Sequence, residues 1–300
     1  MSGSDLAYRG RFAPSPTGPL HLGSLVAALA SYLDARHCSG SWLVRMDDLD
    51  PPREEPGAAD NILHSLQCHG LHWDEHILYQ RTRTAAYNAA LANLADRNHL
   101  FHCDCTRAIL SISGACDSDC KTSQTKISGP AATRIRVPFE QEIVFKDRLQ
   151  RQEHTLLGQS LENFVVKRKD NLFAYQLAVV VDDAEQGITH VVRGSDLLAS
   201  TPRQIFLQQC LLYPTPRYCH VPVITTSQGQ KFSKQNHAPA LDNSMPRSNL
   251  LSALRLLHQR EPPAMLSSVG QLLAFAVEHW SLEQVPAISS IPAAKIGVSA

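Results

Sequence analysis

The chain has 300 residues, with 28 Lys and Arg against 28 Asp and Glu, so its formal net charge is zero. Hydrophobic residues make up 43% and charged residues 19%, a globular balance that excludes a disordered chain or a coiled coil. Zero net charge removes the simple argument for a polyanion partner, although a local basic face is compatible with it.

The sequence predicts neither export nor membrane insertion. The first eleven residues carry three charges and no apolar signal core. The longest uncharged stretch, residues 12–33, is interrupted by three prolines and a glycine within its first eight residues, which excludes a spanning helix. A chain of this length can bury a core without disulfide bonds, so its eight cysteines indicate a reducing cytoplasm.

The first hundred residues alternate between two kinds of segment. Strands are predicted at residues 8–13 and 41–46, and Ala- and Leu-rich helices at 23–38, 58–69 and 84–98. This alternation predicts an α/β fold with a doubly wound parallel sheet that is covered by helices on both faces.

The rest of the chain continues with shorter elements. An apolar run at 177–181 precedes Asp182 and Asp183, and the tail after Pro286 is expected to be frayed. Further strands are predicted at 133–137, 142–146, 164–168, 188–193 and 221–225, and helices at 202–212, 248–258 and 268–280.

The stretch RFAPSPTGPLHLGS, residues 11–24, is typical of a phosphate site. It reads as a strand, a rigid proline turn and a helix start, and free N–H groups at a helix N-terminus attract phosphate. Gly23 lets a bulky ligand approach the backbone, and His21 adds a donor. The alternative is an ordinary turn in which His21 only caps the helix.

A second motif, KFSKQ at residues 231–235, follows a strand and a Ser-Gln-Gly turn. Lys231 and Lys234 can place two ammonium charges on a polyphosphate. Taken alone, an ordinary solvated lysine loop would be the commoner interpretation.

Together, HLGS and KFSKQ resemble the signature pair of class I aminoacyl-tRNA synthetases. RFAPSPTGPLHLGS and VVRGSDLL (191–198) resemble the glutamyl-tRNA synthetase branch. LFAYQLAVVVDD (172–183) and KFSKQNHAPAL (231–241) resemble the glutamyl-Q tRNA(Asp) synthetases, a family of shortened paralogues. The resemblance runs from about residue 8 to 241. It implies that ATP activates L-glutamate, which is then transferred to queuosine in the anticodon loop of tRNA(Asp).

The resemblance also implies a domain organisation. Residues 1–100 and 191–240 would form the two halves of a Rossmann-like catalytic domain. Residues 101–190 would form an inserted subdomain with a zinc module. Residues 241–300 would be a short helical region without a full anticodon-binding domain, because only 65 residues follow Gln235.

Roles for individual residues follow from the same resemblance. A planar, permanently charged guanidinium suits a substrate carboxylate, which favours Arg11 and Arg193. His21 and Lys234 would be catalytic, acting on ATP whose phosphates carry Mg²⁺. ATP would be bound by His21, Gly23, Lys231 and Lys234, and glutamate by Arg11, Phe12, Ala13, Pro14, Ser15, Asp47, Tyr175 and Arg193.

Asp47, placed on the ammonium group of glutamate, departs from the family pattern. Glu is common at this position, and one methylene less shortens the reach by about 1.5 Å. A small shift or a water molecule can make up the difference.

Four of the cysteines form the pattern C-x-C-x10-C-x3-C, made by Cys103, Cys105, Cys116 and Cys120. Four thiolates suit a closed structural Zn²⁺ site, and the metal would order a segment of small residues that has no core of its own. The alternatives are four unrelated reduced thiols or a redox sensor. The family carries a zinc insert here, sometimes with Tyr as its third ligand, and Cys116 aligns near that position.

Two other functions remain open at this level. One is a short glutamyl-tRNA synthetase that charges the 3′ end of tRNA(Glu), and the other is a non-catalytic, zinc-containing tRNA-binding paralogue. The short region after residue 235 favours transfer to queuosine, and the retained Arg11, His21, Arg193 and Lys234 favour an enzyme. The expected partners are ATP, L-glutamate and tRNA(Asp) carrying queuosine, with no membrane and no obligate protein partner.

Overall fold

The computed structural model describes residues 7–105, 127, 129–157, 163–226 and 239–292. Parallel strands lie at its centre, in the hydrogen-bonded orders β1-β2-β3 and β10-β9. The two sets meet where the N–H of Thr189 donates to the carbonyl oxygen of Arg9 at 3.0 Å. These strands are β1 (Arg9–Phe12), β2 (Ser41–Met46), β3 (Leu78–Tyr79), β9 (His190–Gly194) and β10 (Arg217–Val221).

Side chains alternate along β2 between two separate cores. Trp42, Val44 and Met46 belong to one hydrophobic cluster, and Leu43 belongs to the other. Successive residues of a strand point to opposite faces, so a strand whose side chains are buried in two cores must be covered on both sides. The predicted doubly wound α/β architecture is confirmed.

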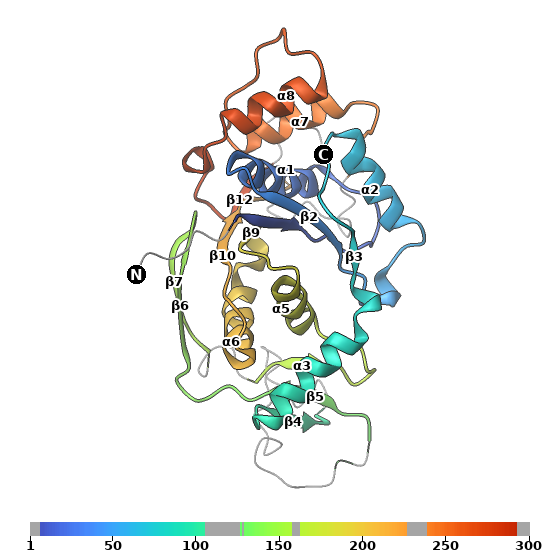
Figure 1. Ribbon diagram of the computed structural model, residues 1–300, viewed down its shortest axis with the longest axis vertical. Coiled ribbons are helices and arrows are strands. Elements are labelled where there is room, and N and C mark those ends of the chain that lie inside the picture. Colours follow the sequence, from blue (N-terminus) through green and yellow to red (C-terminus); the bar gives the residue numbers. More distant parts are fainter. Residues whose placement is uncertain (1–6, 106–126, 128, 158–162, 227–238, 293–300) are drawn as a thin grey trace.

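Helices cover the two faces of these strands (Figure 1). The first core contains residues of α1 (Leu22–His37), α2 (Ala58–Cys68), α7 (Pro246–Leu256) and α8 (Val269–Glu278). The second core contains residues of α3 (Thr84–Asp96), α5 (Tyr175–Glu185) and α6 (Thr201–Leu211). The apolar run before Asp182 thus belongs to helix α5, in which both faces contain buried residues.

Smaller antiparallel units lie outside the parallel strands. One is the sheet of β4 (Leu100–Cys103), β5 (Ala132–Ile135) and β8 (Val165–Lys167), and the other is the hairpin of β6 (Glu142–Asp147) and β7 (Arg151–Leu156). Figure 1 shows the hairpin beside β10. Their place in the chain agrees with an inserted subdomain, but the exact domain limits remain a prediction.

The turn of the hairpin is bound to helix α1 through Asp34. This buried carboxylate accepts hydrogen bonds from the Tyr8 hydroxyl, from Arg148 in the turn, and from Trp280 Nε1 at 3.0 Å. One acidic side chain therefore joins the start of the chain, the hairpin and the end of α8.

The prediction of a frayed tail after Pro286 is wrong for its first residues. β12 (Ser290–Pro292) pairs in parallel with β11 (Val223–Thr225), and Ile291 is buried. The Ala/Ser/Pro composition of the tail shows no strand pattern, because Ile291 is the one residue of β12 that packs in the core. No helix among the described residues has the length and apolar character needed to cross a membrane.

Candidate active site

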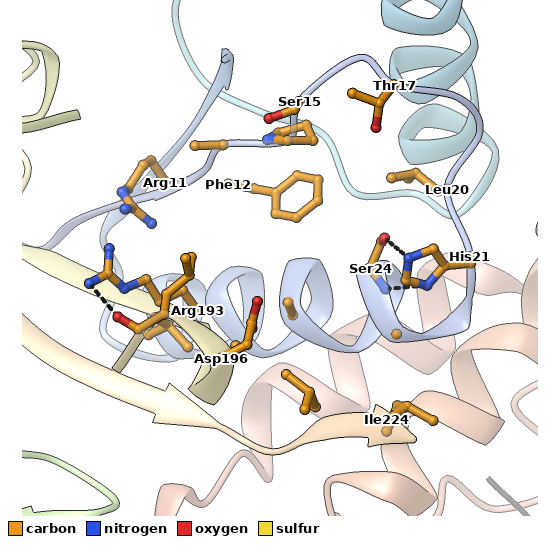
Figure 2. A pocket seen from close by; sticks show the side chains of 18 of the residues that line it. Arg11, Phe12, Ser15, Thr17, Leu20, His21, Ser24, Arg193, Asp196 and Ile224 are labelled. Atoms are coloured by element: carbon orange, nitrogen blue, oxygen red, sulfur yellow. Dashed lines mark hydrogen bonds between the residues drawn. The ribbon is translucent and has the colours of Figure 1, made fainter. Parts of the chain in front are cut away.

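A cavity of about 460 Å³ opens at the carboxyl ends of β1 and β9, beside the N-terminus of α1 (Figure 2). Ligands of doubly wound folds bind at this edge of the sheet. The cavity is lined by Arg11, Phe12, Ala13, Pro14, Ser15, Thr17, Leu20, His21, Gly23, Ser24, Ala27, Tyr175, Val192, Arg193, Gly194, Asp196, Leu197, Pro222, Val223 and Ile224.

The lining brings together nine of the residues predicted for the site. Seven of them belong to β1, the proline turn and the start of α1, one begins α5, and one lies on β9. Figure 2 shows Arg11 and Arg193 at one end of the cavity and His21 at the other. The nine are Arg11, Phe12, Ala13, Pro14, Ser15, His21, Gly23, Tyr175 and Arg193.

Arg11 is held by a carboxylate that the sequence had not assigned to the site. Its Nε and Nη2 lie 3.2 and 3.5 Å from the two carboxylate oxygens of Asp183, which also accepts from Arg45 at 2.5 Å. All three side chains are buried. Burial alone would raise the pKa of Asp183, but the charges of the two arginines outweigh it and lower the pKa.

Arg193 is buried among neutral groups. Its Nε donates to His220 Nε2 at 3.0 Å and its Nη2 to the Thr201 hydroxyl at 2.8 Å. Its Nη1 is buried without a hydrogen-bond partner among the described residues, and the Tyr218 ring centre lies 5.2 Å from its guanidinium carbon. Within the described part of the chain no carboxylate pairs with Arg193. Its charge is thus left for a ligand to neutralise.

Asp47 lies outside this lining. Its carboxylate accepts from Arg45 Nε at 2.8 Å, and its backbone N–H donates to the Pro14 oxygen at 3.0 Å, which ties the end of β2 to the proline turn. Burial raises the pKa of Asp47 to about 6, against the opposing effect of Arg45. The predicted role of Asp47 at the ammonium group stays a prediction.

His21 is the N-cap of α1, as the simpler alternative had it. Its Nδ1 accepts from the Ser24 N–H at 3.2 Å, and its Nε2 lies 3.1 Å from the Ser24 hydroxyl oxygen. Capping fixes the imidazole at the cavity wall, which is compatible with the predicted contact to ATP.

Lys231 and Lys234 fall outside the described residues, but both flanks of their segment are described. On one side, β11 contributes Val223 and Ile224 to the cavity. On the other, Ala240 forms an antiparallel bridge with His21, and the Leu241 N–H donates to the Leu20 oxygen at 2.9 Å. The described residues on both sides of this segment therefore lie beside the cavity.

Sequence reasoning missed Asp183, Thr201 and His220 as parts of the site. Asp183 carried a signal, because an acid that directly follows an apolar run ends up inside the core and needs a charged partner. Thr201 and His220 carried no such signal, because they lie 8 and 27 residues from Arg193 in the sequence and contact it only in the folded chain.

The zinc site is not confirmed. Cys103 and Cys105 are buried beside Phe101 in a small cluster, whereas Cys116 and Cys120 fall outside the described residues. Within the described ranges, no group of three or more His, Cys, Asp or Glu could hold a metal ion.

The fold and several relatives place the chain among known proteins. Solved structures with this fold include the glutamate-tRNA synthetase of Elizabethkingia anophelis, with a TM-score of 0.81 at 22% identity over 97% of this chain and 69% of that protein. Another is a glutamate tRNA ligase from Elizabethkingia meningosepticum, with a TM-score of 0.79 at 23% identity over 95% of this chain and 67% of that protein.

Sequence relatives are nearer. A glutamyl-Q tRNA(Asp) synthetase of Neisseria meningitidis is 48% identical over 289 residues, which cover 93% of this chain and 97% of the relative. One from Xanthomonas campestris is 48% identical over 294 residues and 97% of both chains. Residues 7–258 match the family of tRNA synthetases class I (E and Q), catalytic domain. The chain therefore belongs to the class I tRNA synthetases for E and Q, within the group of glutamyl-Q tRNA(Asp) synthetases.

Proposed function

We propose that this protein activates L-glutamate with ATP and transfers the glutamyl group to queuosine in the anticodon loop of tRNA(Asp). The observation that carries the activation step is the cavity, which holds two buried arginines at one end and the capped N-terminus of α1 at the other (Figure 2). An amino acid with an extra carboxylate and a nucleoside triphosphate match these two ends in charge.

Arg193 is the group that would read the side-chain carboxylate of glutamate. Among the described residues no carboxylate pairs with its guanidinium, and an anionic carboxylate in the cavity would neutralise that charge. Glutamine would offer an amide without charge and leave the buried cation uncompensated. Arg11, already paired with Asp183, would contribute a second donor at the same end, and Ser15 and Tyr175, which also line the cavity, would add polar contacts.

The activation step needs positioning and charge stabilisation more than proton transfer. The α-carboxylate of glutamate attacks the α-phosphorus of ATP in line, and pyrophosphate leaves. His21 at the N-terminus of α1 and Lys234 would contact the phosphates, and Gly23 would allow close approach. Mg²⁺ would be held by the phosphates and would neutralise their charge.

The four cysteines would bind one structural Zn²⁺ in a reducing cytoplasm. The burial of Cys103 and Cys105 supports this proposal. Lys169 Nζ donates to the backbone oxygens of Asp104 and Cys105 at 2.6 and 2.8 Å. These bonds hold the backbone at Cys105 against the residues that follow β8. Cys116 and Cys120 would complete the site.

The acceptor is proposed from the relatives, which carry the name glutamyl-Q tRNA(Asp) synthetase and match this chain over nearly its whole length. The second candidate, charging of tRNA(Glu), draws on the fold shared with glutamate-tRNA synthetases. The relatives' identity of 48% against 22% favours queuosine as the acceptor.

Exchange of labelled pyrophosphate into ATP tests the activation step. We expect exchange that depends on L-glutamate and is not supported by L-glutamine or L-aspartate. A protein that binds tRNA(Asp) without any exchange would be a non-catalytic paralogue and would overturn the proposed activity.

A further inference from the structure

A buried chain of three side chains ends at the cavity. Asp147 Oδ2 lies 2.6 Å from His220 Nδ1, and His220 Nε2 lies 3.0 Å from Arg193 Nε. Asp147, His220 and Arg193 are 1%, 0% and 5% exposed. The three come from the β6–β7 hairpin, β10 and β9, so they meet only through the tertiary fold.

The hydrogen bonds of this chain have only one consistent direction. Asp147 Oδ1 already accepts backbone N–H groups from Leu149 and Gln150 at 2.9 and 2.8 Å, so its carboxylate is an acceptor. Burial would raise the pKa of Asp147, but the bonds from His220 and these N–H groups outweigh it and lower the pKa. His220 must therefore donate from Nδ1, which leaves the lone pair of Nε2 to accept from Arg193.

Burial keeps the imidazole neutral, as this tautomer requires. Burial lowers the pKa of His220, and the charges of Arg193 and Arg11 act in the same direction, whereas Asp147 opposes them. A protonated ring would place an N–H against the N–H of Arg193.

The guanidinium plane of Arg193 is fixed by this contact and by the bonds of Nη2. His220 holds Nε, and Nη2 donates to the Thr201 hydroxyl at 2.8 Å and to the Leu197 oxygen at 3.4 Å. A planar group held at two of its nitrogens has no rotational freedom left, so the orientation of the guanidinium is set before any ligand arrives.

We propose that His220 and Asp147 are positioning residues for substrate binding, which hold the guanidinium of Arg193 in the orientation that binds the carboxylate of glutamate. This proposal rests on the proposed function, because it takes glutamate as the ligand. Neither residue is part of the cavity lining, so both would act on the ligand through Arg193. Asp147 sets the tautomer of His220, and His220 sets the orientation of Arg193.

A purely structural role for the same residues makes a different prediction. Asp147 lies at the turn of the hairpin and also accepts the His220 N–H at 3.3 Å, so the pair fastens the hairpin to β10. If the pair served only to hold the hairpin, loss of the bond between Asp147 and His220 would lower stability, and loss of the bond between His220 and Arg193 would leave KM for glutamate unchanged.

Two substitutions of His220 separate these roles. In His220→Gln the amide oxygen can occupy the position of Nε2 and accept from Arg193, while the bond to Asp147 is lost. In His220→Asn the amide nitrogen can occupy the position of Nδ1 and donate to Asp147, while the bond to Arg193 is lost. The measurement is glutamate-dependent pyrophosphate exchange, with KM for glutamate, KM for ATP and kcat determined separately.

We expect His220→Asn to raise KM for glutamate at least about tenfold, the effect of losing one hydrogen bond to a charged group, with KM for ATP unchanged. His220→Gln should stay within about threefold of the wild type, because it keeps the acceptor for Arg193. Asp147→Asn provides a third test that does not alter His220. Its amide N–H₂ would force the other tautomer, so that Nε2 carries a proton against Arg193, and KM for glutamate should again rise.

His69→Gln is the matched control. His69 is equally buried and bonded at both nitrogens, to the Ser65 oxygen and the Asn249 amide, but it ends α2 away from the cavity. We expect a lower unfolding midpoint and an unchanged KM for glutamate. Equal KM values in the two His220 variants, or a value nearer the wild type in His220→Asn, would overturn the positioning role. A wild-type protein without exchange would instead overturn the proposed function, and the positioning role with it.

Discussion

Replacing Arg193 by methionine should weaken glutamate binding strongly and change the free energy of unfolding very little. In the free protein the guanidinium is a buried charge that pairs only with neutral groups, so its removal also removes a desolvation cost. The groups left behind can satisfy each other, because the Thr201 hydroxyl oxygen already lies 3.1 Å from His220 Nε2. We expect the free energy of unfolding to change by less than about 1 kcal/mol.

The loss in glutamate binding should be much larger. Removing one partner of a buried, hydrogen-bonded charge pair costs about 2–5 kcal/mol. At about 1.4 kcal/mol for each factor of ten, KM for glutamate should rise about 30-fold to several thousand-fold. KM for ATP should stay nearly constant, because Arg193 lies at the end of the cavity away from His21 (Figure 2).

Arg11→Met is the matched comparison. Arg11 pairs with Asp183, so its loss leaves that buried carboxylate with Arg45 as its one remaining guanidinium partner among the described residues. We expect this variant to lose about 1–3 kcal/mol of stability as well as glutamate binding. Urea unfolding and pyrophosphate exchange measure the two effects on the same samples. An Arg193→Met protein that is as unstable as Arg11→Met, or whose KM for glutamate stays within threefold of the wild type, would refute this reasoning.

Three further predictions concern other parts of the molecule. Lys234→Ala should lower kcat for pyrophosphate exchange with little change in KM for glutamate. The control Lys146→Ala, on the exposed face of the hairpin, should leave both kcat and KM unchanged. Near-normal exchange by Lys234→Ala would remove Lys234 from the mechanism. Elemental analysis should find one zinc per chain in the wild type and none in Cys103→Ser, and equal metal content in both would contradict the four-cysteine site. Asp34→Asn should cost about 2–3 kcal/mol at neutral pH, because it leaves the Arg148 charge unpaired. Burial would raise the pKa of Asp34, but Arg148 outweighs it and lowers the pKa, so the stabilisation is present above about pH 4 and is lost as the pH falls through the folded-state pKa. The stability difference between Asp34→Asn and the wild type should therefore shrink in acid, and a constant difference would exclude this linkage.

The alternation of strands and helices was readable from the sequence where each element has one dominant pattern. The predicted strand at 41–46 matches β2, and the predicted helix at 23–38 differs from α1 by one residue at each end. β10 and β12 could not be distinguished from their surroundings by periodicity. β10 has four buried residues in succession and β12 has three residues with one buried, so neither strand alternates between buried and exposed side chains.

The residues of the site also differ in how far the sequence could predict them. Residues close together in the sequence, such as those of the proline turn and His21, were predicted as a group, and the structure brings them to one cavity. The partners that hold the arginines were not, because Asp183 and His220 reach Arg11 and Arg193 only through the fold. For Asp47, local sequence could show the shorter side chain but not its bond to Arg45, two residues away and buried completely.

The proposed transfer to queuosine is tested by identifying the nucleotide that receives glutamate. Labelled L-glutamate and ATP would be incubated with the protein and with tRNA(Asp) that either carries or lacks queuosine, and the labelled nucleotide would then be mapped. We expect label on queuosine in the anticodon loop and none on tRNA that lacks it. Label at the 3′-terminal adenosine, or equal labelling of both tRNAs, would contradict it.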